Sequence, residues 1–403
     1  MRILHIIDTL SPAAGGPPEA IRQLALAYEH EVVDTHIEVV CLDRPDEPFL
    51  SGIPCPVHAL GQSVLGRFAF SPRLWRWLHR HAERFDLMVM NGIWCFPNLA
   101  VRSAARHAGI PYAVFVHGAL DPWFNRKYPL KRIKKTLYWP FQYPVLRDAA
   151  AVFFTTPIER DLAKASFRPN RWKSMVIPCG VTDFGYFPDD VARQIRVFQA
   201  GIPGLRGRAF LLFLGRIHEK KGCDLLLEAF ERLAAVNPDL DLVIAGSGQA
   251  ALISRLQAQA VRCGIAARVH WPGMIRGDLK WGALRSCQAF VLPSHQENFG
   301  ISVVEALCAG RPVLISNQVN IWPDIEADGV GFVEDDTLAG TERLLRRWFQ
   351  LTSVEREAMA CRARPCFLAR FTMNRTIAAI HELIAPEKTS ADFRSGSLEI
   401  SQS

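Results

Sequence analysis

Short apolar segments alternate with helix-forming segments along most of the chain, and this alternation constrains the fold more than any other feature of the sequence. Strands that alternate with helices form parallel sheets covered by helices on both faces. The predicted strands are 2–7, 35–41, 86–91, 112–116, 150–155 and 175–177 in the first half, and 210–214, 241–245, 269–271, 289–292 and 313–315 in the second. The predicted helices are 17–29, 72–84, 98–107 and 130–145, followed by 224–235, 250–263, 278–285 and 301–309.

The chain has 403 residues, which is enough for two domains of ordinary size. Glycine and proline residues gather at 183–207, just before a new predicted strand, and this composition is typical of a domain boundary. We therefore expect an α/β protein with two doubly wound, Rossmann-like domains, 1–185 and 186–372, that face a cleft at the carboxyl ends of their strands. A final helix at 373–385 is expected to cross back to the first domain. The Ser-rich tail, 386–403, is expected to be disordered.

Composition excludes several classes of protein. The 47 Lys and Arg residues outnumber the 40 Asp and Glu residues by only seven, too few for a nucleic-acid binder identified by charge alone. None of the ten cysteines forms a CxxC pair, which argues against zinc ribbons and dithiol redox chemistry and favours the reduced thiols of a cytosolic protein. His5 and Asp8 interrupt the first apolar run, which therefore predicts a buried strand and not an export signal. No window of about 20 uncharged apolar residues predicts a membrane-spanning helix.

The segment 294–310, SHQENFGISVVEALCAG, is the most informative part of the sequence. Its predicted helix, 301–309, is apolar nearly all round, and such a helix is buried. Glu305 within it is costly to bury unless something binds it, so we expect this carboxylate to face a polar ligand. The alternative is an acid in the first turn that interacts with the helix dipole.

The loop before that helix has the features of an anion site. Gly300 allows a ligand to approach the backbone, and the amides of Asn298, Phe299 and Gly300 would lie at the positive end of the helix dipole. Glu297 lies eight residues before Glu305. An anion site between two carboxylates that can bind hydroxyl groups suits a sugar joined to a diphosphate and a ribose.

This Glu-x7-Glu pattern, followed by EALCAGRPV, resembles the second-domain signature of the retaining glycosyltransferases of family 4, which have the GT-B fold. The resemblance extends over most of the chain and includes FLGRIHEKKGCD at 213–224. It implies that Arg216 and Lys221 neutralise the donor diphosphate, that Glu305 holds the ribose hydroxyls and that Glu297 contacts the donor sugar. Taken alone, the two cations would be ordinary surface charges. Arg suits bidentate phosphate contacts, and Lys supplies a point charge.

The resemblance also implies a front-face mechanism in which the leaving diphosphate helps to deprotonate the acceptor. The protein would then act mostly by positioning and charge stabilisation. We expect no metal and no other cofactor, because two cations and a helix N-terminus can neutralise the diphosphate. Asp239 and Asp241 form a DxD pattern, but they follow Asn237-Pro238 and indicate a turn.

GSGQAA at 246–251 matches GxGxxA, so a dinucleotide-binding dehydrogenase has to be considered. Such an enzyme needs an acidic residue about 20 positions later. The segment 251–277 contains no Asp or Glu, although Arg268 would suit a 2′-phosphate. The resemblance implies instead that Gly246 and Gly248 form a turn near the nucleotide.

The first domain supplies fewer candidates. Gly15 and Gly16 follow the first strand, and the resemblance implies that Gly16 approaches the donor phosphates and Gly15 the acceptor. His117 ends an apolar strand before Gly118, so it is expected to face the cleft, where a histidine can bind the donor sugar or stabilise charge. The resemblance implies a catalytic histidine here, near the reacting sugar; the alternative is a core histidine. Asp121 is either on the acceptor side or a turn residue.

Six cations and no acid lie from Arg126 to Lys135, with Tyr128, Tyr138 and Trp139 in and after this run. The run is either a solvated helix face or a surface for anionic lipid or a lipid-diphosphate acceptor. A second basic set lies around Trp75 and Trp77.

The sequence therefore predicts a hexosyltransferase that moves mannose, glucose or a similar sugar from a nucleotide-diphosphate sugar to a glycan or lipid-linked acceptor. We expect a cytoplasmic protein, attached peripherally to the inner face of the membrane, that functions in bacterial surface polysaccharide biosynthesis and binds no nucleic acid. The alternatives are another GT-B activity, such as a sugar-phosphate synthase or a nucleotide-sugar epimerase, and a non-catalytic basic scaffold.

Overall fold

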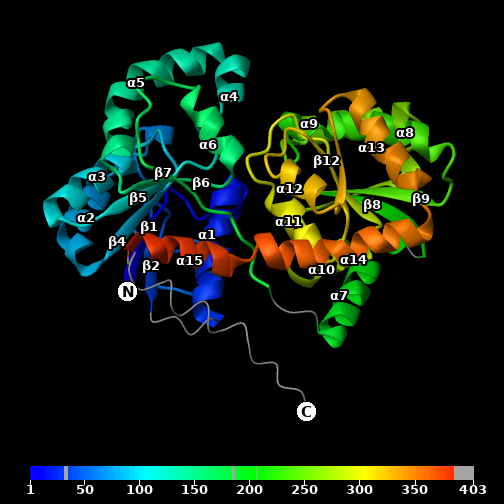
Figure 1. The fold of residues 1–403 in the computed structure, drawn as a ribbon, viewed down its shortest axis with the longest axis horizontal. Helices are drawn as coiled ribbons and strands as arrows, with labels where there is room; N and C mark the ends of the chain where they lie inside the picture. Colours follow the sequence, from blue (N-terminus) through cyan, green and yellow to red (C-terminus); the bar gives the residue numbers. More distant parts are fainter. Residues whose placement is uncertain (31–34, 184–186, 206, 385–403) are drawn as a thin grey trace. The chain divides into compact units, whose positions relative to one another are not determined.

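The computed structural model describes residues 1–30, 35–183, 187–205 and 207–384. The chain forms two α/β units, each built on one parallel sheet (Figure 1). Unit 1 contains Met1–Thr182 and the segment that begins at Met373, and unit 2 contains Asp183–Thr372. The predicted boundary between 185 and 186, the end of the predicted crossover helix at 385 and the predicted tail, 386–403, lie outside the described residues.

Unit 1 has a seven-stranded parallel sheet with the order β3-β2-β1-β4-β5-β6-β7. Its strands are β1 (Arg2–Ile6), β2 (His36–Cys41), β3 (Val57–Ala59), β4 (Leu87–Asn91), β5 (Tyr112–Phe115), β6 (Ala151–Phe154) and β7 (Ser174–Val176). The strand order reverses between β1 and β4, which pair directly although they are not consecutive. The edge strand β3 was not predicted.

The helices of unit 1 cover both faces of its sheet. They are α1 (Gly16–His30), α2 (Pro72–His81), α3 (Phe96–Ala108), α4 (Pro122–Lys127), α5 (Pro129–Asp148), α6 (Pro157–Lys164) and α15 (Met373–Ile384), with short 3-10 helices at Pro12–Ala14, Pro48–Gly52, Gly66–Phe68 and Ala82–Arg84. Proline stands in the first turn of α2 to α6, where its missing N–H costs no hydrogen bond.

Alternate residues of the same strands belong to two apolar cores. Met88 and Met90 of β4 pack with α2, α3 and α5, whereas Leu87 and Val89 pack with α1 and α15. Burial on both faces is the reason that these strands are continuous apolar runs. Figure 1 shows α15 (red) beside α1 (blue), so the last described helix is part of unit 1.

Unit 2 has a six-stranded parallel sheet with the order β10-β9-β8-β11-β12-β13. Its strands are β8 (Ala209–Leu214), β9 (Leu240–Ala245), β10 (Val269–Gly273), β11 (Ala289–Leu292), β12 (Val313–Ser316) and β13 (Gly331–Glu334). The order reverses between β8 and β11, which pair at Ala289 with Leu211 and at Phe290 with Leu212. The sequence analysis missed the edge strand β13.

The helices of unit 2 include one in the segment 183–207, which was predicted to contain the domain boundary. Here α7 (Pro188–Gly201) packs so closely on α10 that a Cβ at Gly282 would lie 2.0 Å from the carbonyl oxygen of Gln194. The 183–207 segment is therefore partly helical, and its glycine and proline content marks the ends of a helix. The other helices are α8 (Cys223–Ala234), α9 (Ala250–Arg262), α10 (Gly277–Ser286), α11 (Ile301–Cys308), α12 (Trp322–Ala327), α13 (Leu338–Gln350) and α14 (Ser353–Arg370), with 3-10 helices at Pro203–Leu205, Glu219–Lys221 and Ala266–Arg268.

Candidate active site

The predicted donor-site residues of unit 2 follow the two strands between which the strand order reverses. Arg216 and Lys221 lie in the loop after β8, and Glu297 lies in the loop after β11. The carboxyl ends of parallel strands lie at one edge of the sheet, and ligands of open α/β sheets bind at this edge where the order reverses. The topology therefore brings together residues that are about 80 positions apart in the sequence.

Direct contacts join these two loops. The Lys221 ammonium forms an ion pair with the Glu297 carboxylate. Next to it, the Lys220 Nζ donates a hydrogen bond to Gln296 Oε1 at 3.1 Å, and the backbone N–H of His295 donates to the Lys220 carbonyl at 2.8 Å. Two of the predicted residues, one for the diphosphate and one for the sugar, are thus in contact.

Positive charge is concentrated in the loop after β8, where Arg216, Lys220 and Lys221 lie within six residues. The Lys221 side chain is only 12% exposed. Burial, and then the positive charges of Lys220 and Arg216, lower the pKa of Lys221 well below its ordinary value. The Glu297 carboxylate opposes this effect because it stabilises the ammonium. A bound anion would relieve the same repulsion, so the loop is suited to a diphosphate.

Two glycines after β9 pack closely against the backbone of the segment that carries Arg216. A Cβ on Gly246 would lie 1.7 Å from the carbonyl oxygen of Gly215, and a Cβ on Gly248 would lie 2.5 Å from that of Ile217. These two predicted nucleotide-turn glycines therefore allow the chain after β9 to lie against the Arg216 segment. Their contact with a nucleotide stays a prediction.

Glu305 has an ionic partner that the sequence analysis missed. Its side chain is buried in α11, and the Lys280 Nζ from α10 lies 2.7 Å from its Oε1. The residue is the fifth of α11, whose first turn holds no acidic side chain. The alternative of a first-turn acid is therefore wrong. No spacing rule relates Lys280 to Glu305, because the two helices come together only in the folded chain.

The helix α11 begins directly after the predicted anion-binding segment. Gly300 is its N-cap residue and has a φ of +86°, in the left-handed region that favours glycine. The first N–H groups of a helix have no intrahelical acceptor and carry the positive end of the dipole. The Phe299 ring is buried in an edge-on contact with Phe371. Phe299 can therefore contact a ligand only through its backbone. Asn298 is half-buried.

In unit 1, His117 follows β5 at the carboxyl edge of the sheet. Its backbone φ is +49°, and its ring stacks on that of Phe115 with centroids 5.1 Å apart. Its Nε2 lies 3.3 Å from the side-chain oxygen of Asn91. An amide oxygen only accepts, so the proton of the neutral ring lies on Nε2 and Nδ1 keeps its lone pair. Burial lowers the pKa of His117 to about 4, and the ring is therefore neutral at pH 7.

Asn91 orients His117 and was missed by the sequence analysis. It ends β4 beside β1, where the strand order of unit 1 reverses, and its Nδ2 lies 3.3 Å from Nδ1 of the buried His5. Burial, and then repulsion from His117 when that ring is protonated, lowers the pKa of His5 to about 4. A polar residue that ends an otherwise apolar strand is the signal that would have identified Asn91.

Glu159 fixes the loop that contains His117. Its buried carboxylate accepts hydrogen bonds from the N–H groups of Gly118 and Thr155, each at 2.6 Å, and from the Thr155 hydroxyl at 2.8 Å. The loops after β5 and β6 are thereby tied together. In the sequence, Glu159 is indistinguishable from any acid in the first turn of a helix.

The remaining predicted residues of unit 1 have local structural roles. Gly15 has a φ of +94° and Gly16 begins α1, so both lie in the loop after β1 as expected. Asp121 is the N-cap residue of α4, and its Oδ1 accepts from the Trp123 N–H at 2.7 Å. This cap agrees with the interpretation of Asp121 as a turn residue. The proposed contacts of Gly15, Gly16 and Asp121 with donor or acceptor stay predictions.

Two family models match the chain. The model for glycosyl transferases group 1 matches 200–364, and the glycosyl transferase 4-like domain matches 15–180. The two segments together cover most of the sequence and include the predicted site residues of both units. The chain belongs to the group 1 glycosyltransferases. This result confirms the predicted family, and the interpretation of the Gly246 segment as part of a dehydrogenase is wrong.

Individual relatives of this glycosyltransferase agree with the family. The mannosylfructose-phosphate synthase of Agrobacterium fabrum is 28% identical over 179 residues, which are 43% of this chain and only 38% of that relative's length. The O-antigen chain mannosyltransferase C of Escherichia coli is 24% identical over 345 residues, 84% of each chain. The crystal structure of Anabaena HepE in complex with UDP and glucose matches with a TM-score of 0.75 at 18% identity over 96% of this chain and 100% of that one. The predicted GT-B fold is confirmed.

The described residues of this glycosyltransferase contain no group of three His, Cys, Asp or Glu side chains that could hold a metal ion. Asp241 of the DxD pattern is buried in β9, where it contacts Arg208 at 2.9 Å and His270 at 2.7 Å. Across 1–30, 35–183, 187–205 and 207–384, no helix is both long and apolar enough to cross a membrane.

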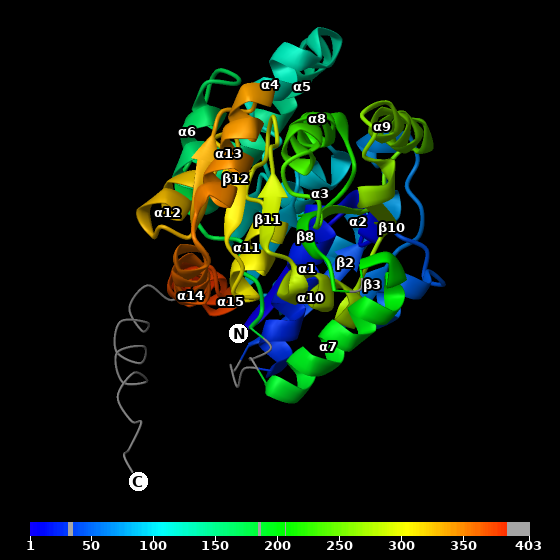
Figure 2. The same cartoon turned by 90° about the vertical axis from the view of Figure 1, so that its right-hand side faces the viewer.

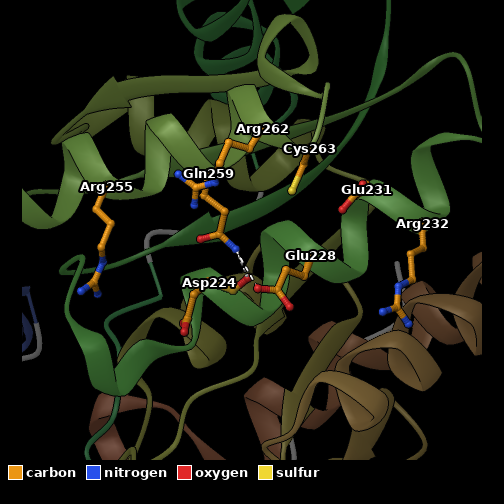
Figure 3. A pocket seen from close by; sticks show the side chains of 8 residues that line it. All are labelled: Asp224, Glu228, Glu231, Arg232, Arg255, Gln259, Arg262 and Cys263. Atoms are coloured by element: carbon orange, nitrogen blue, oxygen red, sulfur yellow. Dashed lines mark hydrogen bonds between the residues drawn. The ribbon is translucent and has the colours of Figure 1, made fainter.

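A pocket of about 440 Å³ lies elsewhere in unit 2 of this glycosyltransferase, between α8 and α9 (Figure 3). Acidic and basic side chains line it in equal number, and Gln259 bridges the two helices through a 3.1 Å hydrogen bond to Glu228. The acidic and basic side chains of this lining compensate each other's charge. The pocket contains none of the predicted site residues, and we assign no role to it.

Proposed function

We propose that this glycosyltransferase moves a hexose, such as mannose or glucose, from a nucleotide-diphosphate sugar to a glycan or lipid-linked acceptor, with retention of configuration. The main support is the group formed by Arg216, Lys221 and Glu297 where the strand order of unit 2 reverses, beside the N-terminus of α11. A mannosyltransferase among the relatives and a solved structure with UDP and glucose support the same class of donor.

In the proposed donor complex, Arg216, Lys221 and the N–H groups at 298–300 bind the diphosphate. The Lys221 ammonium pairs with Glu297 in the structure. The diphosphate then competes with Glu297 for this cation. Its arrival releases the Glu297 carboxylate, which can accept a hydrogen bond from a hydroxyl of the donor sugar. Glu305 accepts from the ribose hydroxyls while Lys280 keeps its negative charge compensated.

The proposed transfer step breaks the bond between the anomeric carbon and the diphosphate oxygen and forms a bond from that carbon to an acceptor oxygen. The acceptor proton passes to the leaving diphosphate oxygen, so no protein base is consumed. Preorganised cations stabilise the negative charge that develops on the leaving group. His117 contributes as a neutral ring whose Nδ1 accepts a hydrogen bond from a sugar hydroxyl, while Asn91 holds Nε2.

The setting we propose is the cytoplasm of a bacterium that assembles a surface polysaccharide. All ten cysteines lie in described segments, and all are unpaired thiols, as expected in a reducing compartment. The E. coli relative is named for O-antigen chain synthesis.

A panel of nucleoside diphosphates tests the proposal by thermal shift. The correct one, at 100 times its dissociation constant, should stabilise the protein by about 2.7 kcal/mol. Failure of every nucleotide to bind would favour a non-catalytic scaffold. Conversion of a nucleotide sugar without an acceptor would favour an epimerase, and transfer only to sugar phosphates would favour a sugar-phosphate synthase.

We further propose that transfer needs no metal ion, because two cations and a helix N-terminus neutralise the leaving diphosphate. The expected result is an unchanged rate in EDTA, measured as release of the nucleoside diphosphate. Loss of activity in EDTA that Mg²⁺ or Mn²⁺ restores would contradict this.

A further inference from the structure

The helix α5 carries a row of exposed apolar side chains on the face opposite its core contacts. Leu130, Ile133, Leu137 and Phe141 are 77%, 58%, 73% and 60% exposed. Spacings of three and four residues place them on one side of the helix, and we call this row the apolar stripe. The other side of α5 buries Trp139, Gln142, Val145 and Leu146.

Positive charge is concentrated in α4 and in the half of α5 that carries the start of the apolar stripe. No Asp or Glu lies between Asp121 and Asp148. Five exposed cations form what we call the basic rim: Arg126, Lys127, Lys131, Arg132 and Lys134. The sixth cation of the run, Lys135, is turned toward the protein and donates to the Ala119 carbonyl at 3.3 Å, with its Nζ 4.9 Å from the centre of the Trp94 ring. Of the six cations from Arg126 to Lys135 that were predicted to bind anionic lipid, Lys135 therefore does not belong to the exposed surface.

The chemistry of this face limits what can cover it. A contiguous apolar row in water marks a binding surface. A second copy of the same face would bring two basic rims together, and this repulsion opposes self-association. A bilayer with anionic headgroups matches both features, because its acyl boundary accepts the apolar side chains and its surface attracts the cations.

We infer that α5 lies in the plane of an anionic membrane, with the apolar stripe at the acyl boundary and the basic rim on the headgroups. The helix binds as a peripheral element and does not cross the bilayer, since no helix in the described ranges is of the spanning type. Figures 1 and 2 show α4 and the start of α5 extending beyond the sheet of unit 1. Membrane binding is independent of the proposed donor chemistry.

Vesicle flotation of the full chain tests the inference. The protein should float with vesicles that contain phosphatidylglycerol, should remain unbound with pure phosphatidylcholine, and should dissociate as salt rises. L137S/F141S removes half of the apolar stripe, and K131Q/K134Q removes two charges of the basic rim. Each pair should weaken binding about tenfold or more.

Matched controls separate these effects from general changes in surface. V236S/V354S alters two side chains in unit 2 that are 75% and 74% exposed, and R171Q/K173Q removes two exposed cations of unit 1 outside α5. Both controls should bind vesicles like the wild type. Anionic vesicles should also slow amide hydrogen exchange at 129–141 and leave α14 unchanged.

Equal flotation of the wild type and both α5 variants would overturn the inference. So would a concentration-dependent dimer, measured by light scattering, that only L137S/F141S abolishes, since the stripe would then bind a second copy. Nucleotide affinity should be unchanged in the α5 variants, which shows that they are folded. If no variant or wild type bound a nucleotide, the proposed function would fail while the membrane result still stood.

Discussion

Glu297→Gln should lower the rate of sugar transfer about 100-fold while the binding of a plain nucleoside diphosphate stays the same or becomes tighter. In the structure, the Glu297 carboxylate forms an ion pair with the Lys221 ammonium. Removal of that negative charge leaves Lys221 available to the diphosphate. It also removes the group that is proposed to hold the sugar. Calorimetry with the nucleotide and a transfer assay measure the two effects separately.

Glu305→Gln is the natural comparison, because it neutralises the second carboxylate of the predicted donor site with almost no change in volume. Its partner is Lys280, and its proposed ligand is the ribose, so nucleotide affinity should fall by about 1.5–3 kcal/mol. Glu219→Gln, an exposed acid of the loop after β8, serves as the control and should leave both readouts unchanged. The assignment of roles is wrong if Glu297→Gln and Glu305→Gln weaken nucleotide binding equally.

Arg216→Ala and Lys221→Met should each weaken nucleoside diphosphate binding by about 1.5–3 kcal/mol, the range for a charged hydrogen bond, and should reduce turnover strongly. Methionine is used at position 221 because it keeps most of the length of the side chain and removes its charge. Arg255→Ala removes an exposed cation from the pocket in Figure 3 and should have no effect. Unchanged calorimetric affinity in both site variants would contradict the diphosphate assignment.

The pH dependence of binding provides a second measurement on the same cation. The protonated Lys221 binds the diphosphate, and burial with its positive neighbours lowers its pKa. Affinity should therefore fall as pH rises through this lowered pKa, at a pH below that of an ordinary lysine. Lys221→Met should lose this part of the profile. Lys221→Met leaves the Glu297 carboxylate without its cation, which can lower the stability of the protein. The double variant Lys221→Met/Glu297→Gln removes both charges, and it should lose the same part of the pH profile if reduced stability is not responsible.

The parallel sheets were predictable because their central strands are continuous apolar runs between helices, as at Leu87–Asn91 and Ala289–Leu292. The edge strands β3 and β13 are short and only partly buried, and their sequences VHA and GFVE give no comparable signal. The helix α7 was hidden by the prolines and glycines at its ends. In unit 2 the sequence analysis also named no helix after 309, although α12, α13 and α14 follow.

Of the candidate site, the sequence indicated the residue types in the two loops but not their contacts. Local pattern and family resemblance predicted roles for Arg216, Lys221 and Glu297, and these roles stay predictions. The pairs of Glu305 with Lys280 and of His117 with Asn91 depend on packing between distant elements, and no local pattern contains that information. The role of Asp121 was ambiguous because a carboxylate in a loop after a strand can cap the next helix or bind a ligand.

The position of α15 has a consequence for the order in which the protein can be completed during synthesis. Unit 2 is one continuous segment inserted into unit 1, and the N–H of Met373 donates to the Val181 carbonyl where the chain leaves and re-enters. Met373, Ile377 and Ile380 complete an apolar core that strands near the N-terminus began. On the ribosome, unit 2 therefore has all of its residues before unit 1 does. Until α15 has been translated, the part of this sheet face that α1 does not cover stays exposed.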